Sequence, residues 1–341
     1  MLDIGNKTPF PAALFPGLDV ENREFATLLV KGTFSIRDTG RVDISEEQAP
    51  VQYAPEYTGE PGASSIKYDG DAHPETPGTS VVLVGSARAG RPVQQLDVLL
   101  SAGPLRKLLR VSGDRRWDRV FGIWRVTPPS RFTEMPLLWE RAFGGWDRSH
   151  PDPKKHEWEP RNPIGTGLFA SRGARDPGEV ALPNIEYPSD LVTRRASRPA
   201  PAGFGCLSPD WEPRRTRAGT YDAAWQRSRS PLLPRNFDVR FHESAAHDQI
   251  CTRRLEGGER VSVLNATPEG RLEFALPKVS LEIELWIRSQ SSVVEPVLDR
   301  VLIEPDLRRV VIEWRASFPC EGGVVYINRA RVRSREGALL G

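Results

Sequence analysis

Residues 281–287 read LEIELWI, and the pattern of this stretch says most about the fold. Its side chains alternate strictly, with Leu281, Ile283, Leu285 and Ile287 on one side and Glu282, Glu284 and Trp286 on the other. Successive side chains of a β-strand point to opposite faces of a sheet, so the alternation predicts a strand with one buried and one exposed face. Such strands are typical of antiparallel sheets in sandwich-type folds.

Segments on both sides of this stretch have the same character. Residues 298–316 read LDRVLIEPDLRRVVIEWRA and predict a hairpin that turns at Glu304-Pro305-Asp306. Further strand-like segments lie at 25–36, between 79 and 126, and between 259 and 277. No helical pattern separates them, which favours an antiparallel meander over parallel βαβ units. GSARAGRP at 85–92 lacks the Lys-Ser/Thr of a phosphate loop, and we interpret it as a hairpin turn.

The middle of the chain, residues 128–255, is rich in Pro, Gly, Arg and Trp and loses the alternation. It predicts a long ordered, loop-rich insertion with one or two short helices, the best candidate being Tyr221–Ser228 with Thr220 as N-cap. We therefore predict a mainly β protein with an antiparallel β-sandwich-like body. Residues 1–127 and 256–328 would pack together as one composite domain, and the polar tail 329–341 would fray.

Composition indicates a soluble globular protein: of 341 residues, 38% are hydrophobic and 27% charged. The 47 basic and 45 acidic residues nearly cancel, which argues against a nucleic-acid binder. Cys206, Cys251 and Cys320 are far apart and odd in number, so they predict no disulfide framework and fit a reducing cytosol. The N-terminal residues do not resemble a secretion signal, and no apolar run is long enough for a membrane helix. We expect a cytoplasmic protein without a membrane partner.

Histidine spacing gives no metal site. HESAAHD at 242–248 places its second histidine one residue later than the HExxH zinc motif, so the two rings would not share a helix face. His150 and His156 lie in a Pro- and Lys-bearing loop that nothing holds in ligand geometry. We expect neither a metal nor a cofactor.

Residues 139–152 read WERAFGGWDRSHPD and combine titratable groups with aromatic residues and glycines. Gly144 and Gly145 allow positive φ, which would reverse the chain and display Trp146 and Asp147. Asn162-Pro163 and Gly165 would do the same nearby. These loops either shape the fold or grip a partner. Two rival functions remain open: a hydrolase that uses acids and histidines of 140–157, and a carbohydrate-binding β-sandwich with exposed tryptophans.

A second candidate surface is the basic stretch from Arg106 to Arg131. Its centre consists of Arg115, Arg116, Trp117 and Arg119. Arginine beside tryptophan is frequent at protein hot spots and can also stack on nucleic-acid bases. Asp114 and Asp118 dilute the charge, so the pattern favours a solvated or internally paired sheet face, with a protein contact as the first alternative and nucleic acid as the second.

Several separate motifs, in order, resemble one bacterial family. They are KGTFSI (31–36), PGTSVVLVGSARA (77–89), VSGDRRW (111–117), MPLLWERAFGGWD (135–147), NPIGTGL (162–168), LPNIE (182–186), PAGFG (201–205), AGTYDAAW (218–225), PLLPRNFD (231–238) and the 298–316 hairpin. The chain resembles a domain-of-unknown-function family encoded beside type VI secretion spike genes, whose members are described as adaptor-chaperones for toxic effectors.

The resemblance implies a non-enzymatic protein that binds an effector through its PAAR-like or N-terminal region and helps to load it onto the spike protein. The partner-binding residues would then be Trp139, Arg141, Phe143, Gly144, Gly145, Trp146, Asp147, Asn162 and Gly165, together with Arg115, Arg116, Trp117 and Arg119.

Overall fold

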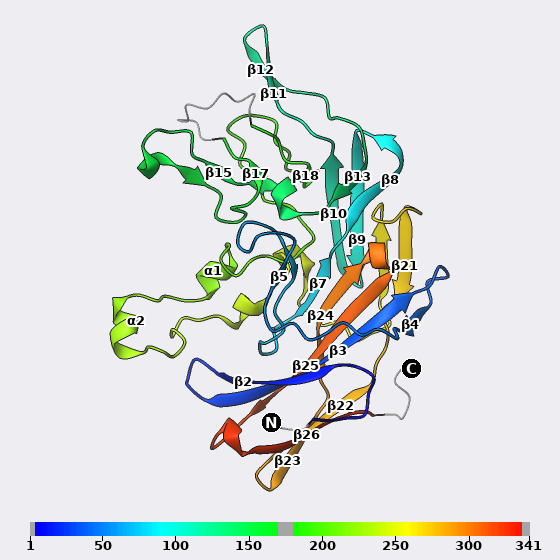
Figure 1. Ribbon diagram of the computed structural model, residues 1–341, viewed down its shortest axis with the longest axis vertical. Helices are drawn as coiled ribbons and strands as arrows, with labels where there is room; N and C mark the ends of the chain where they lie inside the picture. Colours follow the sequence, from blue (N-terminus) through cyan, green and yellow to red (C-terminus); the bar gives the residue numbers. More distant parts are fainter. Residues whose placement is uncertain (1–3, 170–179, 336–341) are drawn as a thin grey trace.

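The computed structural model describes residues 4–169 and 180–335, which are built mainly from β-strands (Figure 1). The largest sheet has seven strands, and its two long central strands pair in antiparallel register over eleven residues. In spatial order the sheet contains β19 (Ile250–Cys251), β7 (Thr79–Leu83), β24 (Val297–Glu304), β25 (Arg309–Pro319), β3 (Glu24–Ile36) and β2 (Ala12–Leu18), with β4 (Val42–Ile44) also paired to β3. Strands from both ends of the chain therefore form one sheet.

Two smaller sheets flank it. The five-stranded sheet contains β18 (Ile185–Glu186), β10 (Leu105–Ser112), β9 (Gln95–Ala102), β20 (Arg260–Leu264) and β21 (Arg271–Ala275). The four-stranded sheet contains β1 (Ile4–Asn6), β26 (Ile327–Ser334), β22 (Leu281–Ile287) and β23 (Gln290–Val294), and lies at the lower end in Figure 1. One hydrophobic core draws buried side chains from all three sheets.

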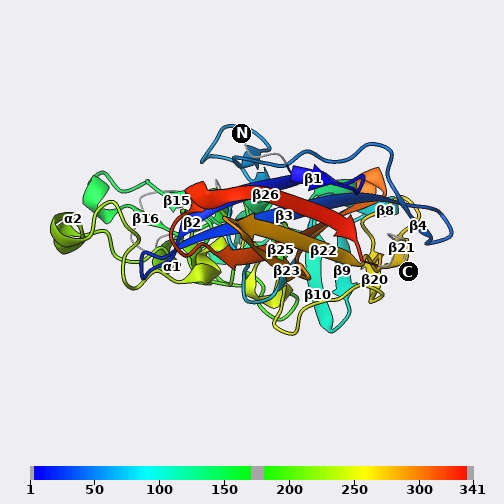
Figure 2. The same cartoon turned by 90° about the horizontal axis from the view of Figure 1, so that it is seen from below.

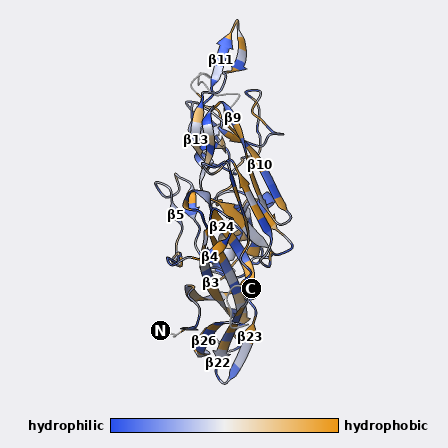
Figure 3. Ribbon diagram, turned by 90° about the vertical axis from the view of Figure 1, so that its right-hand side faces the viewer, coloured by the Kyte–Doolittle hydropathy of each residue, from blue (hydrophilic) through white to orange (hydrophobic). Residues whose placement is uncertain are grey.

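Five two-stranded pairs complete the strands of the described residues. They are β8 (Ser86–Val93) with β13 (Phe132–Pro136), β11 (Trp117–Val120) with β12 (Ile123–Val126), β14 (Phe143–Gly144) with β17 (Thr166–Gly167), β15 (Trp146–Asp147) with β16 (Glu157–Trp158), and β5 (Glu56–Tyr57) with β6 (Ile66–Tyr68). The β11–β12 hairpin projects from the upper end of the molecule (Figures 1 and 3).

Both faces of the seven-stranded sheet are covered. On β3, Leu28 and Val30 face the shared core, while Lys31 and Thr33 face the other side and are also buried. Residues 45–78 cover this second face: Gln48 accepts a hydrogen bond from the N–H of Thr33 at 2.8 Å, and its side chain donates back to the Thr33 carbonyl at 3.0 Å. The second face is therefore an internal polar layer.

Two α-helices occur in the described residues, α1 (Arg214–Arg217) and α2 (Ala223–Ser228). They belong to an arm, residues 214–242, whose outer end carries α2 and lies away from the sheets in both Figures 1 and 2. The helix predicted at 221–228 begins two residues later, because Asp222 rather than Thr220 caps it by accepting the N–H of Trp225 at 2.8 Å.

The predicted fold class is confirmed: the protein is mainly β, with mostly antiparallel sheets and two short α-helices in the part described. β22 has the predicted bounds, and Leu281, Ile283 and Leu285 are buried as expected. The 297–319 hairpin also forms, turning at Pro305–Leu307. None of the helices in residues 4–169 and 180–335 is long and apolar enough to cross a membrane.

Two local expectations were wrong. Residues 86–93 form strand β8 rather than a hairpin turn, because they pair with β13. Residues 329–334 do not fray but form most of β26, since Ala330 and Val332 alternate with arginines and enter the core between β1 and β22. The last six residues of the expected tail, 336–341, lie outside the described residues.

Candidate functional site

The two signature loops of the sequence pack against each other. Asn162 is buried, and its side-chain amide donates hydrogen bonds to the carbonyls of Trp139 at 2.8 Å and Phe143 at 3.0 Å. Its own carbonyl accepts the N–H of Gly145 at 2.9 Å. The predicted positive φ of the two glycines is confirmed, with 153° at Gly144 and 90° at Gly145. A Cβ atom on Gly145 would lie 2.3 Å from the Gly165 carbonyl oxygen, so these glycines permit close backbone contact.

Most side chains of the first loop point inward. Trp139 is buried against Trp211, with an edge-to-face ring distance of 6.0 Å. Phe143 belongs to a small buried cluster that also contains Trp117. Asp147 is buried and accepts hydrogen bonds from the N–H and hydroxyl of Ser149 at 3.0 and 2.6 Å. The loop thus contributes several internal contacts to the fold.

Trp146 is the predicted aromatic anchor that remains partly in solvent, with 41% of its surface exposed. Its ring stacks on Trp158 at 5.1 Å, and the Arg148 guanidinium lies 4.6 Å from its centroid. Trp158 in turn has the Arg215 guanidinium at 5.1 Å. Because these neighbours cover the aromatic faces, the stack offers little flat surface for a sugar ring, which the carbohydrate-binding alternative needs.

The predicted arginine cluster does not form one continuous surface. Arg115 is largely buried and donates to the Glu186 carboxylate and to the Pro183 carbonyl. Trp117 is buried beside Phe143, which brings the two predicted groups together through the interior. The Arg141 guanidinium donates to the Asn184 side-chain oxygen at 3.2 Å. Of the three arginines at the centre of the stretch, Arg116 and Arg119 are exposed.

The acids and histidines of the hydrolase alternative act as turn caps. His150 Nδ1 accepts the N–H of Asp152 at 2.9 Å, and Asp152 accepts the N–H of Lys154 at 3.0 Å. Asp147 is engaged by Ser149, as described above. Within residues 4–169 and 180–335, no group of three or more His, Cys, Asp or Glu side chains is placed to hold a metal ion. These groups are thus engaged by backbone and side-chain groups of their own loop.

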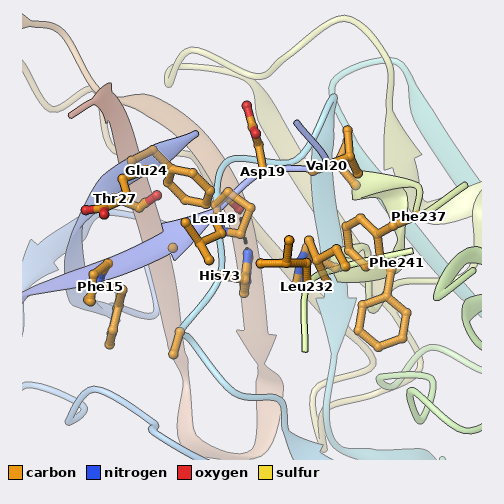
Figure 4. A pocket seen from close by; sticks show the side chains of 18 of the residues that line it. Phe15, Leu18, Asp19, Val20, Glu24, Thr27, His73, Leu232, Phe237 and Phe241 are labelled. Carbon is orange, nitrogen blue, oxygen red and sulfur yellow. Dashed lines mark hydrogen bonds between the residues drawn. The ribbon is translucent and has the colours of Figure 1, made fainter. Parts of the chain in front are cut away.

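A large open groove lies elsewhere, at the β2 end of the polar face of the seven-stranded sheet (Figure 4). Its volume is about 1010 Å³. β2 and β3 line one side of the groove, the arm lines another, and residues 72–74 lie between them, where His73 contacts His242 of the arm. The groove residues are Phe15–Val20, Glu24, Phe25, Thr27, Ala72–Pro74, Ala218, Tyr221, Pro231–Leu233, Phe237, Val239, Phe241, His242, Val324 and Val325.

The groove is apolar and accessible. Leu18, Tyr221 and Val325 expose 41%, 53% and 81% of their surfaces, and all three line it. Tyr53, which packs its ring against Phe15 at 5.9 Å, is also exposed. Exposed apolar side chains scattered singly are ordinary on protein surfaces, but a contiguous patch is typical of an interaction site. The groove is therefore the best candidate for a binding surface.

The arm is fixed to the body at both ends of the groove wall. Arg214 is buried, and its guanidinium donates to the Asp69 carboxylate of the body at 3.0 Å and, within the arm, to the Phe241 carbonyl at 2.8 Å. At the other end, Arg229 donates to the backbone carbonyl of Val20, just after β2. The groove wall is thus held in place before any partner arrives, which lowers the entropic cost of binding.

A buried ion cluster lies under the inner end of the groove. It consists of Lys31, Asp71, Asp299, Arg300, Glu313 and Arg315, three cations and three carboxylates. Lys31 Nζ contacts the Asp71 carboxylate at 2.8 Å, and Arg315, which is fully buried, contacts Asp299 at 3.0 Å and Glu313 at 2.6 Å. Each charge has opposite partners within the polar layer, as buried charges require.

Two histidines connect this cluster with the groove. His73 Nδ1 lies 2.8 Å from the Pro74 carbonyl and must donate to it, while Nε2 accepts from the guanidiniums of Arg300 and Arg315 at 3.0 Å each. Its partners thus fix His73 as the neutral Nδ1–H tautomer, and burial together with these cations holds its pKa well below the usual range. The ring of His242 stacks on His73 at 5.3 Å. Because its lone pair is already engaged, His73 is a poor general base.

Replacing His242 by glutamine should reduce the amount of folding stability that the protein loses between pH 7 and pH 5. Burial, and after it the charge of Arg214, lowers the pKa of His242 to about 4 from 6.5. Between these values the unfolded chain binds a proton that the folded chain does not, so folding stability falls as pH falls. From pH 7 to pH 5 the wild type should lose about 2 kcal/mol more than His242→Gln. Urea unfolding at both pH values measures the difference.

Burial and the neighbouring Glu313 raise the pKa of Asp71, so this carboxyl makes folding more stable as pH falls, opposite to His242. Its effect is the same in wild type and in His242→Gln and therefore cancels when their slopes are compared. His247→Gln, a change at an exposed histidine outside the cluster, is the control and should keep the wild-type slope. If the stability of wild type and of His242→Gln falls equally between pH 7 and pH 5, His242 is not the source of the acid sensitivity.

A family model described as "Uncharacterized protein conserved in bacteria (DUF2169)" matches residues 21–315. The chain belongs to this family. The DUF2169 match includes β3, both signature loops, the arm and the whole buried ion cluster, whereas β2 and Val324-Val325 lie outside it. No curated protein and no solved structure matches the chain. The expected membership of a bacterial family of unknown function is confirmed, while the family's description names no activity, ligand or partner.

Sequence reasoning missed the groove of this DUF2169 protein. Its lining comes from four separate stretches, near 15–27, 72–74, 218–242 and 324–325, which no spacing rule connects. A partial signal was present in the apolar residues of the loop-rich region, Leu232, Leu233, Phe237 and Phe241, which a polar surface loop would not contain. Residue type alone predicts a partner surface at Arg115, Trp117, Trp139 and Asn162, but their side chains are buried or nearly so.

Proposed function

We propose that this DUF2169 protein is an adaptor-chaperone of a type VI secretion system. It would bind a cognate toxic effector in the cytosol, cover an apolar part of that effector, and help to load it onto the spike protein. The observation that supports this most strongly is the groove. It is accessible and apolar, has a volume of about 1010 Å³, and the arm that forms one wall is fixed to the body. The type VI context itself rests on the motif resemblance and is part of the proposal.

The dimensions of the groove favour a protein segment as the occupant. Its volume is at the upper end of the roughly 300–1,000 Å³ typical of small-molecule pockets, and it is open rather than enclosed. Titratable groups near its floor are neutral or engaged: the lone pair of His73 is occupied by two guanidiniums. We therefore assign the groove to an apolar segment of the effector, in its PAAR-like or N-terminal region.

The chaperone effect follows from mass action. A partner that binds only the folded effector stabilises it by RT ln(1 + [L]/Kd), about 2.7 kcal/mol at a hundredfold excess over Kd. Covering apolar effector surface also removes a site of aggregation. Because the groove is open rather than enclosed, a bound effector could leave again at the spike.

Binding should depend on the exposed apolar residues of the groove. Leu18→Asp combined with Val325→Asp places two carboxylates on the apolar surface at positions that are 41% and 81% exposed, so the fold should survive. We expect at least a tenfold loss of affinity for the effector encoded beside this gene, because unpaired charges in an apolar contact must be desolvated. Co-purification and calorimetric titration of the co-expressed pair measure it.

The matched control is Leu108→Asp with Leu307→Asp, two other exposed leucines, 39% and 58% exposed, outside the groove. It should bind like the wild type. Retention of full affinity by a folded groove variant would reject the groove as the site. Loss of affinity in Trp146→Ala instead would return the site to the first signature loop.

A further inference from the structure

The tip of the β11–β12 hairpin is a second apolar surface, separate from the groove. Phe121 is 99% exposed and Ile123 is 60% exposed. The hairpin stands out from the sheets at the end opposite the four-stranded sheet (Figures 1 and 3). Among the exposed large apolar side chains of the described residues, Phe121 is the most exposed.

The base of the hairpin belongs to the fold, whereas its tip does not. Trp117 is buried with Phe143 and Leu182, which anchors the hairpin to the body. The turn residues Phe121 and Gly122 have φ of 49° and 81°. Tight hairpin turns with positive φ at both positions favour Asn, Asp or Gly, and a bulky aromatic residue there is strained. At 99% exposure the Phe121 ring buries almost no surface within the fold, so it is available for contact with a partner.

Arginines surround the apolar tip on both faces of the hairpin. Arg119 pairs across the strands with Trp124, and Asp118 pairs with Arg125, so Arg119 and Arg125 lie on opposite faces. The guanidinium of Arg195, from a neighbouring loop, lies 5.2 Å from the Trp124 ring. Arg116 at the base is also exposed, and Asp118 is the single acid between positions 116 and 127.

We propose that this hairpin tip binds the surface of a membrane that contains anionic phospholipids. Phe121 and Ile123 would enter the boundary between headgroups and acyl chains, and the arginines around them would pair with lipid phosphates. Guanidinium groups match phosphate oxygens in a fork geometry, and clustered arginines favour anionic leaflets.

The arrangement favours a lipid surface over a protein pocket. A tip inserted into a headgroup layer is surrounded by phosphates on all sides, and arginines on both faces of the hairpin suit that environment. A membrane-crossing helix needs a long apolar run, whereas a two-residue tip at the surface leaves no such pattern in the sequence.

The expected contact is weak and reversible. A single myristoyl chain binds a bilayer with an association constant of about 10⁴ M⁻¹, and two apolar side chains with four arginines should reach about that strength or less. The tip would therefore position the protein at a membrane without holding it there permanently.

Co-flotation with lipid vesicles tests the proposal. We expect the full-length protein to float with vesicles of equal parts phosphatidylcholine and phosphatidylserine, and not with phosphatidylcholine alone. Phe121→Ser with Ile123→Ser should reduce the bound fraction about tenfold or more. Arg119→Gln with Arg125→Gln should also reduce it, and added salt should weaken wild-type binding.

Leu108→Ser with Leu307→Ser is the matched control, since both leucines are exposed away from the hairpin, and it should float like the wild type. Circular dichroism establishes that each variant is folded. Failure of the wild type to float, equal binding to both vesicle types, or full binding by the tip variant would each overturn the proposal. A wild type that ignores vesicles while the tip variant loses the effector would make the tip a protein contact.

Discussion

Replacing Arg315 by methionine should lower the free energy of unfolding by about 3–5 kcal/mol. Arg315 is fully buried and contacts Asp299 at 3.0 Å, Glu313 at 2.6 Å, the Asp71 carbonyl at 2.7 Å and His73 Nε2 at 3.0 Å. Methionine fills much of the volume but leaves the carboxylates with one compensating cation fewer, in a layer that excludes water. Urea unfolding followed by circular dichroism measures the loss.

An exposed ion pair provides the comparison. Arg37 contacts Asp43 at 2.8 Å, but its side chain is 63% exposed. Arg37→Met should therefore change stability by less than about 1 kcal/mol. Similar small losses for both variants would show that the buried ion cluster does not hold the covering segment 45–78 against the sheet.

Replacing Gly145 by alanine should destabilise the fold by about 3 kcal/mol or more. The backbone there has φ of 90°, which disfavours any residue with a Cβ, and the added methyl group would lie 2.3 Å from the Gly165 carbonyl oxygen. Backbone atoms must then separate, which disrupts the contact between the two signature loops. Thermal and urea unfolding both measure the effect.

Gly122 is the control that measures the strain of positive φ without the steric clash of an added Cβ atom. It has φ of 81° at the hairpin tip, with no atom within 4 Å of an added Cβ. Gly122→Ala should cost about 1 kcal/mol, the strain of the backbone conformation alone. Wild-type stability in Gly145→Ala together with loss of the effector would contradict the packing account and make this glycine a partner contact.

The sequence predicted the sheet class well because much of the chain has one apolar face. LEIELWI at 281–287 alternates, and its alternation matches the burial of β22 closely. The 297–319 hairpin was also predictable, since its turn residues Pro305 and Asp306 interrupt two apolar segments. Positive φ at Gly144 and Gly145 followed from residue type, whereas the same expectation for Gly165 was wrong, since its φ is not positive.

The polar layer and the groove were not predictable. Lys31, Glu313 and Arg315 fall on the face of β3 and β25 that alternation would assign to solvent, yet all three are buried. They are covered by the irregular segment 45–78, which has no periodic pattern. The groove is the part of this same face that the segment leaves open, so it depends on where a loop ends rather than on any local motif.

The central claim is that the groove between β2 and the arm holds a protein partner. Site-specific photo-crosslinking tests it most directly, with a photoreactive phenylalanine analogue at position 221, where Tyr221 lines the groove and is 53% exposed. The same analogue at exposed position 108, outside the groove, is the control. With the co-expressed effector, the account predicts a covalent adduct from position 221 and none from 108. Adducts from both positions, or an intact complex that gives none from 221, would contradict it.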